Sequence, residues 1–211
     1  MPVRQAAPVG APIWIDLTTS DVDRAQEFYG TVFGWTFEKA GPQYGSYVGA
    51  FKGGVPVAGL IQNDPQWNAP DGWTTYLHTE DIDATIAEIT AAGGASCLEP
   101  MDIPNRGRMG LVTDSTGAFF GLWQPKGHRG FEVVNENGAP LYFQLTTPDY
   151  AKALDFYREV FGWQIDTVSD TDEFRYSTAS FDGEALVGVM SYDVQPDWVF
   201  FLGCDDVDKT V

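Results

Sequence analysis

The chain opens with a strand pattern followed by a helix pattern. Ile13, Ile15 and Leu17 occupy every second position, and this period of two predicts a short strand over residues 13–17. Beyond them the apolar residues fall three to four positions apart, which predicts one stripe of an amphipathic helix; they are Val22, Ala25, Phe28 or Tyr29, Val32 and Phe33. Ser20, with Asp23 three positions later, is the expected N-cap, and Gly34 is expected to end the helix.

The same pattern returns 128 residues later. Residues 12–35 read PIWIDLTTSDVDRAQEFYGTVFGW, and residues 140–163 read PLYFQLTTPDYAKALDFYREVFGW. A repeat of this length is far longer than the period of a solenoid protein. The sequence therefore predicts the tandem duplication of a domain-sized unit.

A fainter copy lies between these two. Residues 74–94 again predict a strand and a helix, and three probable strands follow over residues 95–102, 109–114 and 118–124. A fourth start begins at Trp198, and by comparison with the second unit it lacks its last helix and three strands. We therefore expect four strand–helix starts, and we expect the incomplete unit to self-associate or to belong to a longer protein.

The repeated A-x-x-F-Y-x-x-V-F-G-W segment, together with TDSTGAFFGLWQP at residues 113–125, resembles the vicinal oxygen chelate superfamily. This superfamily holds glyoxalase I, bleomycin resistance proteins and extradiol dioxygenases, and the chain is most similar to its two-module, glyoxalase-like actinobacterial members. The resemblance implies an α+β fold in which paired βαβββ units form cup-shaped sheets. It implies one module over residues 10–125 and a second, incomplete module over residues 139–211.

Composition narrows the class of partner. The net charge of −18 argues against nucleic acid, whose phosphates require clustered Lys and Arg. The acidic balance either attracts a cationic ligand or only keeps a solvated surface soluble. No stretch is long and apolar enough to span a membrane, and Cys97 and Cys204 show no pairing motif, so we expect free thiols and a cytoplasmic protein.

We expect no metal and no cofactor. In metal-dependent relatives the ligands come from the opening and closing strands of each unit, and those positions carry neither imidazole nor carboxylate in this chain. The opening positions are Trp14, Thr74, Tyr142 and Val199, and the closing positions are Gly59, Gly121 and Gly188. A catalytic divalent ion needs about three such ligands. This absence argues against the usual chemistry of glyoxalase I and the extradiol dioxygenases.

The inward positions predict an aromatic cup for a flat or apolar organic molecule, opened further by the three glycines. Its expected ligand-binding residues are Trp14, Thr74, Tyr76, Phe119, Gly121 and Trp123 in the first module, and Tyr142, Gln144 and Phe201 in the second. The alternative is that the aromatic side chains simply fill a cavity that has lost its metal.

His78 and Asp16 are the candidate catalytic residues. His78 could act as a general base that Asp16 orients, or it could be a hydrogen-bonded structural histidine. His128 lies in the linker and is expected to be exposed. Three hypotheses stay open: metal-free binding or sequestration of a small aromatic or cationic ligand, a glyoxalase-like lyase or hydroxylase using His78 and Asp16 or a non-standard metal site, and an interaction scaffold with closed cups.

Overall fold

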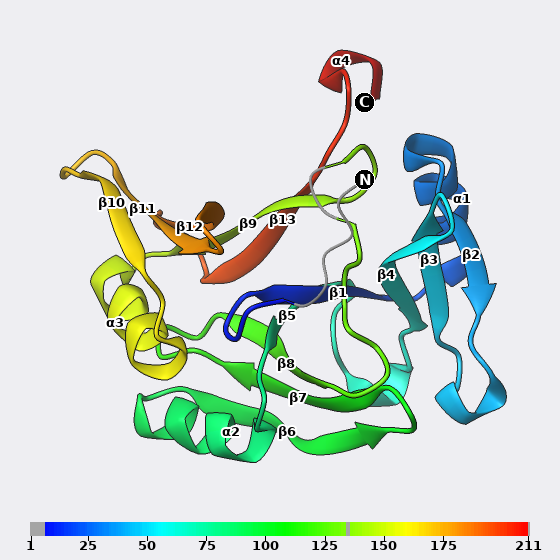
Figure 1. The fold of residues 1–211 in the computed structure, drawn as a ribbon, viewed down its shortest axis with the longest axis horizontal. Coiled ribbons are helices and arrows are strands. Elements are labelled where there is room, and N and C mark those ends of the chain that lie inside the picture. The colour runs from blue at the N-terminus through cyan, green and yellow to red at the C-terminus, as the bar shows by residue number, and fades with distance from the viewer. Residues whose placement is uncertain (1–6, 134–135, 211) are drawn as a thin grey trace.

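The computed structural model describes residues 7–133 and 136–210, and its first half contains two units of the same element order (Figure 1). The first unit has β1 (Pro12–Thr19), α1 (Val22–Phe33), β2 (Thr36–Lys39), β3 (Val48–Lys52) and β4 (Val55–Gln62), with short 3-10 helices at Pro42–Tyr44 and Pro65–Trp67. The second has β5 (Gly72–His78), α2 (Ile82–Ala91), β6 (Ala95–Ile103), β7 (Gly107–Thr113) and β8 (Phe119–Pro125).

These strands form one eight-stranded sheet in the order β2-β3-β4-β1-β5-β8-β7-β6. β1 and β5 are antiparallel neighbours at its centre, and each is parallel to the last strand of its own unit, β4 or β8. The strand order is therefore symmetric about the β1–β5 pair. The predicted α+β fold of paired βαβββ units is confirmed.

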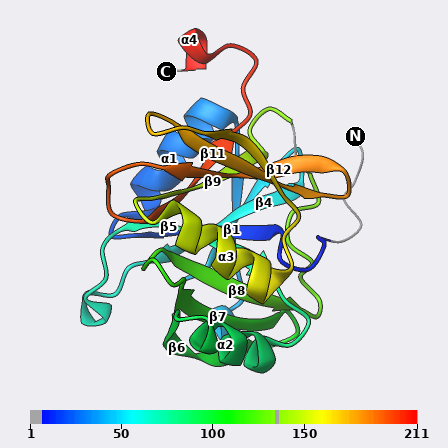
Figure 2. The same cartoon turned by 90° about the vertical axis from the view of Figure 1, so that its left-hand side faces the viewer.

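The second half repeats this order of elements in a third unit, followed by the first strand and a short helix of a fourth. It has β9 (Pro140–Thr147), α3 (Tyr150–Phe161), β10 (Ile165–Asp170), β11 (Arg175–Phe181), β12 (Glu184–Ser191), β13 (Asp197–Leu202) and α4 (Val207–Thr210). Its sheet has the order β10-β11-β12-β9-β13, with β13 antiparallel to β9 as β5 is to β1. Figures 1 and 2 both show α4 standing away from the body of the molecule beyond the end of β13.

α1, α2 and α3 begin at aspartates, and α1 and α3 end at glycines. The Asp21 side chain accepts the backbone N–H of Arg24 at 2.9 Å, and Asp81 caps α2 in the same way. Ser20 instead donates to the Asp71 carboxylate, so the predicted N-cap was wrong by one residue. Gly34 ends α1 in the left-handed conformation at φ 66°, as predicted.

Hydrogen bonds join the two halves at equivalent positions. The Trp35 indole N–H donates to the carbonyl of Gly138 at 2.7 Å, and the Trp163 indole N–H donates to the carbonyl of Gly10 at 3.0 Å. Both glycines have positive φ, 72° and 78°. Because residue pairs exchange contacts reciprocally, the duplication is arranged about an approximate two-fold axis.

α3 joins the two halves through a buried polar contact. The Tyr157 ring lies 6.1 Å from that of Phe120 on β8, and its hydroxyl donates to Asp114 Oδ2 at 3.0 Å. Asp114 Oδ1 accepts the backbone N–H groups of Thr116 and Ala118, which fixes the turn before β8. Figure 2 shows α3 lying across the molecule above α2. The TDSTG motif therefore fixes a turn and, through Asp114, makes a hydrogen bond between the second half and the first.

None of the helices in the described ranges has the length and apolar character needed to cross a bilayer. Cys97 and Cys204 are free thiols.

Candidate functional site

A hydrogen-bonded cluster lies on the inner face of the first sheet. Trp14 and Asp16 are two residues apart on β1, so their side chains share one face. Asp16 Oδ1 accepts the Trp14 indole N–H at 2.8 Å and the Tyr47 hydroxyl at 2.8 Å. The Trp14 nitrogen also lies 3.0 Å from the Tyr47 oxygen, which closes a triangle of three polar groups.

Asp16 is the ionisable centre of this cluster. Burial raises the pKa of its carboxyl from 3.8 to about 6, although hydrogen bonds from Tyr47, Trp14 and Tyr76 lower the pKa in part. Burial and the nearby Asp16 charge raise the pKa values of Tyr47 and Tyr76 well above 10, so both phenols keep their protons. The site therefore holds one carboxylate that titrates near neutrality among neutral donors.

The glycines opposite this cluster do not open the cup, contrary to expectation. A Cβ at Gly59 would overlap the Tyr47 hydroxyl and the Asp16 carboxylate, and one at Gly121 would overlap the Tyr76 ring. In the second sheet a Cβ at Gly188 would overlap the Tyr176 hydroxyl. The missing side chains therefore make room for phenols and a carboxylate.

His128 of the linker packs against two of the predicted aromatic residues of the cup, Trp14 and Trp123. Trp14 is 4% exposed, and its ring lies edge-on to His128 at 4.3 Å. Trp123 is 7% exposed and donates its indole N–H to the His128 carbonyl at 2.9 Å. The prediction of an exposed His128 was wrong, and burial with the nearby Arg106 charge lowers its pKa to about 4. Both tryptophans are therefore buried.

The remaining first-sheet positions differ in accessibility. Tyr76 is buried at 6% exposure, whereas Phe119 is 39% exposed. Thr74 and Asp16 pair across β5 and β1, and both are partly exposed. Tyr47 is also partly exposed. The accessible part of the cluster is therefore Asp16, Tyr47 and Thr74.

His78 and Asp16 are not brought together. Asp16 pairs with Thr74, four residues before His78 on β5. The buried His78 places its Nδ1 2.7 Å from the carbonyl oxygen of Ala7. The Ala7 carbonyl, and not the Asp16 carboxylate, therefore orients this ring.

The predicted second-module residues lie on the other sheet. The Tyr142 hydroxyl is 2.8 Å from the Tyr176 hydroxyl, and the Tyr142 ring lies 6.3 Å from the exposed Phe201 ring. Gln144 pairs with Gly188 and donates to Thr146 at 3.4 Å. The predicted site residues therefore form two groups on two sheets.

The donor set does not fit a divalent metal ion. In the strand register, Gly59, Gly121 and Gly188 pair with Asp16, Tyr76 and Gln144, which lie two positions after the ligand positions expected from the sequence. The first cluster thus offers one carboxylate among phenols and an indole, where about three imidazole, carboxylate or thiolate ligands are needed. Across the described ranges, no three His, Cys, Asp or Glu side chains gather closely enough to hold an ion.

Sequence reasoning missed Tyr47, which completes the cluster. Its signal was present in the duplication, because Tyr47 and Tyr176 occupy equivalent places just before or within the third strand of their units, and both hydroxyls point at the closing-strand glycine. Aligning the two copies beyond residue 35 would have found it.

Comparison with known proteins agrees with this architecture. The model of the Glyoxalase/Bleomycin resistance protein/Dioxygenase superfamily matches residues 12–122 and 140–211. The Mycobacterium tuberculosis protein named "Putative glyoxylase CFP32" is 33% identical over 220 residues, which cover 100% of this chain and 83% of that protein. The anthracycline biosynthesis protein DnrV of Streptomyces peucetius is 31% identical over 221 residues, which cover 96% of this chain and 80% of that protein.

A solved structure shows the same fold. The Mn(II)-bound glyoxalase from Novosphingobium aromaticivorans superposes with a TM-score of 0.63 at 15% identity, covering 88% of this chain and 63% of that one. The chain thus spans less than two thirds of that protein, and at this identity the likeness concerns the fold alone. From the family match and the relatives together, the chain belongs to the Glyoxalase/Bleomycin resistance protein/Dioxygenase superfamily.

Proposed function

We propose that the first sheet binds a small organic cation with an aromatic framework, and that it does so without a metal ion. The observation that carries the proposal is the Asp16 carboxylate, which is held by Trp14 and Tyr47 and has a pKa of about 6. At pH 7 this carboxylate is mostly ionised although it is largely desolvated. A cationic group placed beside it replaces the lost hydration and favours the ionised form.

The surroundings of Asp16 support an aromatic partner. Thr74 offers a hydroxyl beside the carboxylate, and Phe119 presents a partly exposed ring farther along the same face of the sheet. The net charge of −18 raises the concentration of cations near the surface. Tyr142, Gln144 and Phe201 form a separate predicted contact surface, which is uncharged.

The relatives favour the same class of ligand. DnrV and the DauV protein of Streptomyces sp. are both named anthracycline biosynthesis proteins. Anthracyclines join a planar aromatic system to an amino sugar, and this chemistry matches a carboxylate in an aromatic setting. A role in sequestration or resistance follows if the ligand is bound and released unchanged.

The test is fluorescence titration with an amino-sugar anthracycline, with and without EDTA. We expect saturable binding that EDTA leaves unchanged, and affinity that falls as the pH drops through about 6, because protonation removes the Asp16 charge. Asp16→Asn should weaken binding by about tenfold or more, the effect of 1.4 kcal/mol. Asp155→Asn, on the exposed face of α3, is the control with the same change in net charge. Equal loss in both variants, or binding that needs a metal ion, would refute the proposal.

A second candidate is an acid–base enzyme in which Asp16 transfers the proton. It is favoured by the pKa of about 6, since a general base works best near the operating pH. His78 would be a weaker choice because its Nδ1 is engaged with the Ala7 carbonyl. Chromatographic assay for conversion of the bound compound separates the two functions: turnover lost in Asp16→Asn but kept in His78→Gln supports the enzyme, and recovery of unchanged ligand supports the binding protein.

A further inference from the structure

His128 brings an aromatic ring to the first sheet from the linker that follows β8. Its imidazole lies edge-on to the Trp14 ring at 4.3 Å, and it lies 5.6 Å from the Trp123 ring at an interplanar angle of 69°. Edge-to-face packing of this kind is a favoured arrangement of two aromatic rings. The imidazole therefore fills a space whose walls are the two indoles, and we call this space the tryptophan slot.

Backbone hydrogen bonds fix the linker on both sides of this imidazole. The Arg106 carbonyl accepts the His128 backbone N–H at 3.0 Å, and the His128 carbonyl accepts the Trp123 indole N–H at 2.9 Å. Farther along the linker, the Phe131 N–H donates to the Ile13 carbonyl at 2.9 Å. The imidazole takes part in none of these bonds, so the path of the linker does not depend on where this side chain points.

The imidazole is poorly satisfied where it lies. Its Nε2 atom is buried and has no hydrogen-bond partner among the described residues. Such an atom costs free energy, because it has given up its hydrogen bonds to water. Burial and the nearby Arg106 charge lower the pKa of His128 to about 4, so the ring is neutral at pH 7. Rotation of the side chain toward solvent keeps every hydrogen bond described above and lets Nε2 bind water again.

Trp14 connects the tryptophan slot with the Asp16 carboxylate. Its indole N–H donates to Asp16 Oδ1 at 2.8 Å, and its ring contacts His128. One indole therefore touches both the space filled by a neutral aromatic ring and the buried carboxylate. A ligand with an aromatic framework and a cationic group needs these two environments side by side.

We propose that the His128 imidazole closes the tryptophan slot until the aromatic framework of the ligand displaces it and packs against Trp14 and Trp123. The inference rests on the proposed function, to which it adds where the ring binds and what it displaces. A flat ring can replace the imidazole because both pack favourably against indoles. His128 then limits affinity, since the ligand binds only the fraction of molecules in which the slot is open.

The first measurement follows His128 by NMR in the unsubstituted chain. Its ring C–H signals are titrated with pH, alone and with saturating indole, a flat ring that carries no charge. We expect the pKa of His128 to rise from about 4 to about 6.5, the value of an exposed histidine, once indole fills the slot. A pKa that stays near its low value at saturation, or the absence of saturable indole binding, would overturn the inference.

The second measurement compares affinities. His128→Ala empties the slot without changing the charge at pH 7, so indole should bind about fivefold tighter or more, as expected if the slot is open in about a fifth or fewer of the unsubstituted molecules. Equal affinity would contradict this, and weaker binding would make the imidazole a ligand contact. If this variant does not fold, the NMR titration decides alone.

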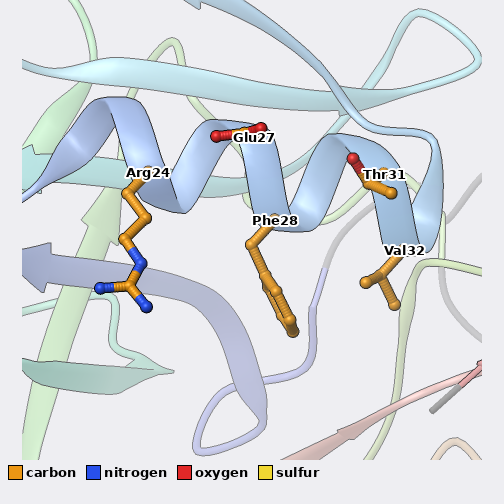
Figure 3. A pocket seen from close by; sticks show the side chains of 5 residues that line it. All are labelled: Arg24, Glu27, Phe28, Thr31 and Val32. Carbon is orange, nitrogen blue, oxygen red and sulfur yellow. The ribbon is translucent and has the colours of Figure 1, made fainter.

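A matched control removes a ring from the opposite face of the sheet. Trp73 alternates with Thr74 on β5 and donates to Tyr29 of α1, so α1 lies on the face away from Asp16. Figure 3 shows Phe28 projecting from α1. This ring lines a shallow groove of about 280 Å³ with Arg24, Glu27, Thr31 and Val32. Phe28→Ala should leave indole binding and the His128 response unchanged, and loss of indole binding in this variant would place the ring in the α1 groove instead.

Asp16→Asn separates this inference from the proposed function. Indole has no charge, so its binding and the His128 response should be the same in Asp16→Asn as in the unsubstituted chain. An anthracycline whose affinity ignores Asp16→Asn, beside an intact His128 response to indole, would refute the cation site and leave the slot standing. The reverse pattern would refute the slot alone.

Discussion

The first and third units share a sequence pattern but differ at the sheet and at the helix. At the sheet, Asp16 beside Gly59 in the first unit is matched by Gln144 beside Gly188 in the third. At the helix, the exposed Phe28 is matched by the buried Phe156. One unit thus has a carboxylate on its sheet and an exposed ring on its helix, whereas the other has a neutral amide and a buried ring, which shows that duplicated positions can keep their geometry and differ in charge and burial.

The largest expected contrast is between the two phenylalanines. Phe156→Ala should lower the free energy of unfolding by about 3–5 kcal/mol, the usual cost of removing a buried ring. Phe28→Ala should change it by less than about 1 kcal/mol, because its ring is mostly in water. Urea unfolding measures both, and similar losses would show that α1 is as well covered as α3.

The second contrast concerns pH. The folded pKa of Asp16, about 6, lies above its unfolded value of 3.8, so folding is favoured by the protonated form and stability is lost as the pH rises from about 4 to 6. At 1.36 kcal/mol for each unit, the loss is about 3 kcal/mol. Asp16→Asn should remove it, and the difference between variant and parent should grow across this range. Gln144→Asn is the control, and a constant difference would show that Asp16 is not buried as a charge.

A third contrast tests the glycines. Gly59→Ala should cost about 1–3 kcal/mol, because the new methyl group displaces the Tyr47 hydroxyl and the Asp16 carboxylate. Gly188→Ala should cost a similar amount by displacing Tyr176. Only Gly59→Ala should also alter the loss of stability between pH 4 and 6, since it alone disturbs Asp16. Identical pH profiles for the two variants would contradict this assignment.

The smallest contrast is between the two tyrosine hydroxyls. Tyr157→Phe leaves Asp114 Oδ2 and the Trp198 indole N–H without their Tyr157 partner in a buried setting, at a cost of about 1–3 kcal/mol. Tyr29→Phe deprives only the Trp73 N–H, closer to solvent, and should cost less than about 1 kcal/mol. Thermal unfolding of the two variants is sufficient, and an equal cost would argue against the special role of Asp114.

The fold could be predicted because it rests on local patterns that occur twice. The period of two at Ile13, Ile15 and Leu17 and the helical stripe up to Gly34 recur in the second copy, so each supports the other. The N-cap was misplaced because Ser20 and Asp21 are both good caps, and the long-range bond from Ser20 to Asp71 decides between them.

The site was harder to predict because its partners are distant in sequence. Asp16 was identified from strand alternation, but Tyr47 comes from the residue just before β3 and Ala7 from the segment before β1. His128 seemed exposed because the linker is polar, yet it packs on Trp14. The glycines suggested empty space because a sequence cannot show which neighbouring side chain occupies it.

The bonds from Trp35 to Gly138 and from Trp163 to Gly10 have a consequence for how the molecule tolerates change. Each tryptophan belongs to one half but hydrogen-bonds the segment just before the first strand of the other half. The two halves therefore contact each other as the subunits of a homodimer do, although they belong to one polypeptide. Loss of either tryptophan is therefore expected to loosen the opposite half first.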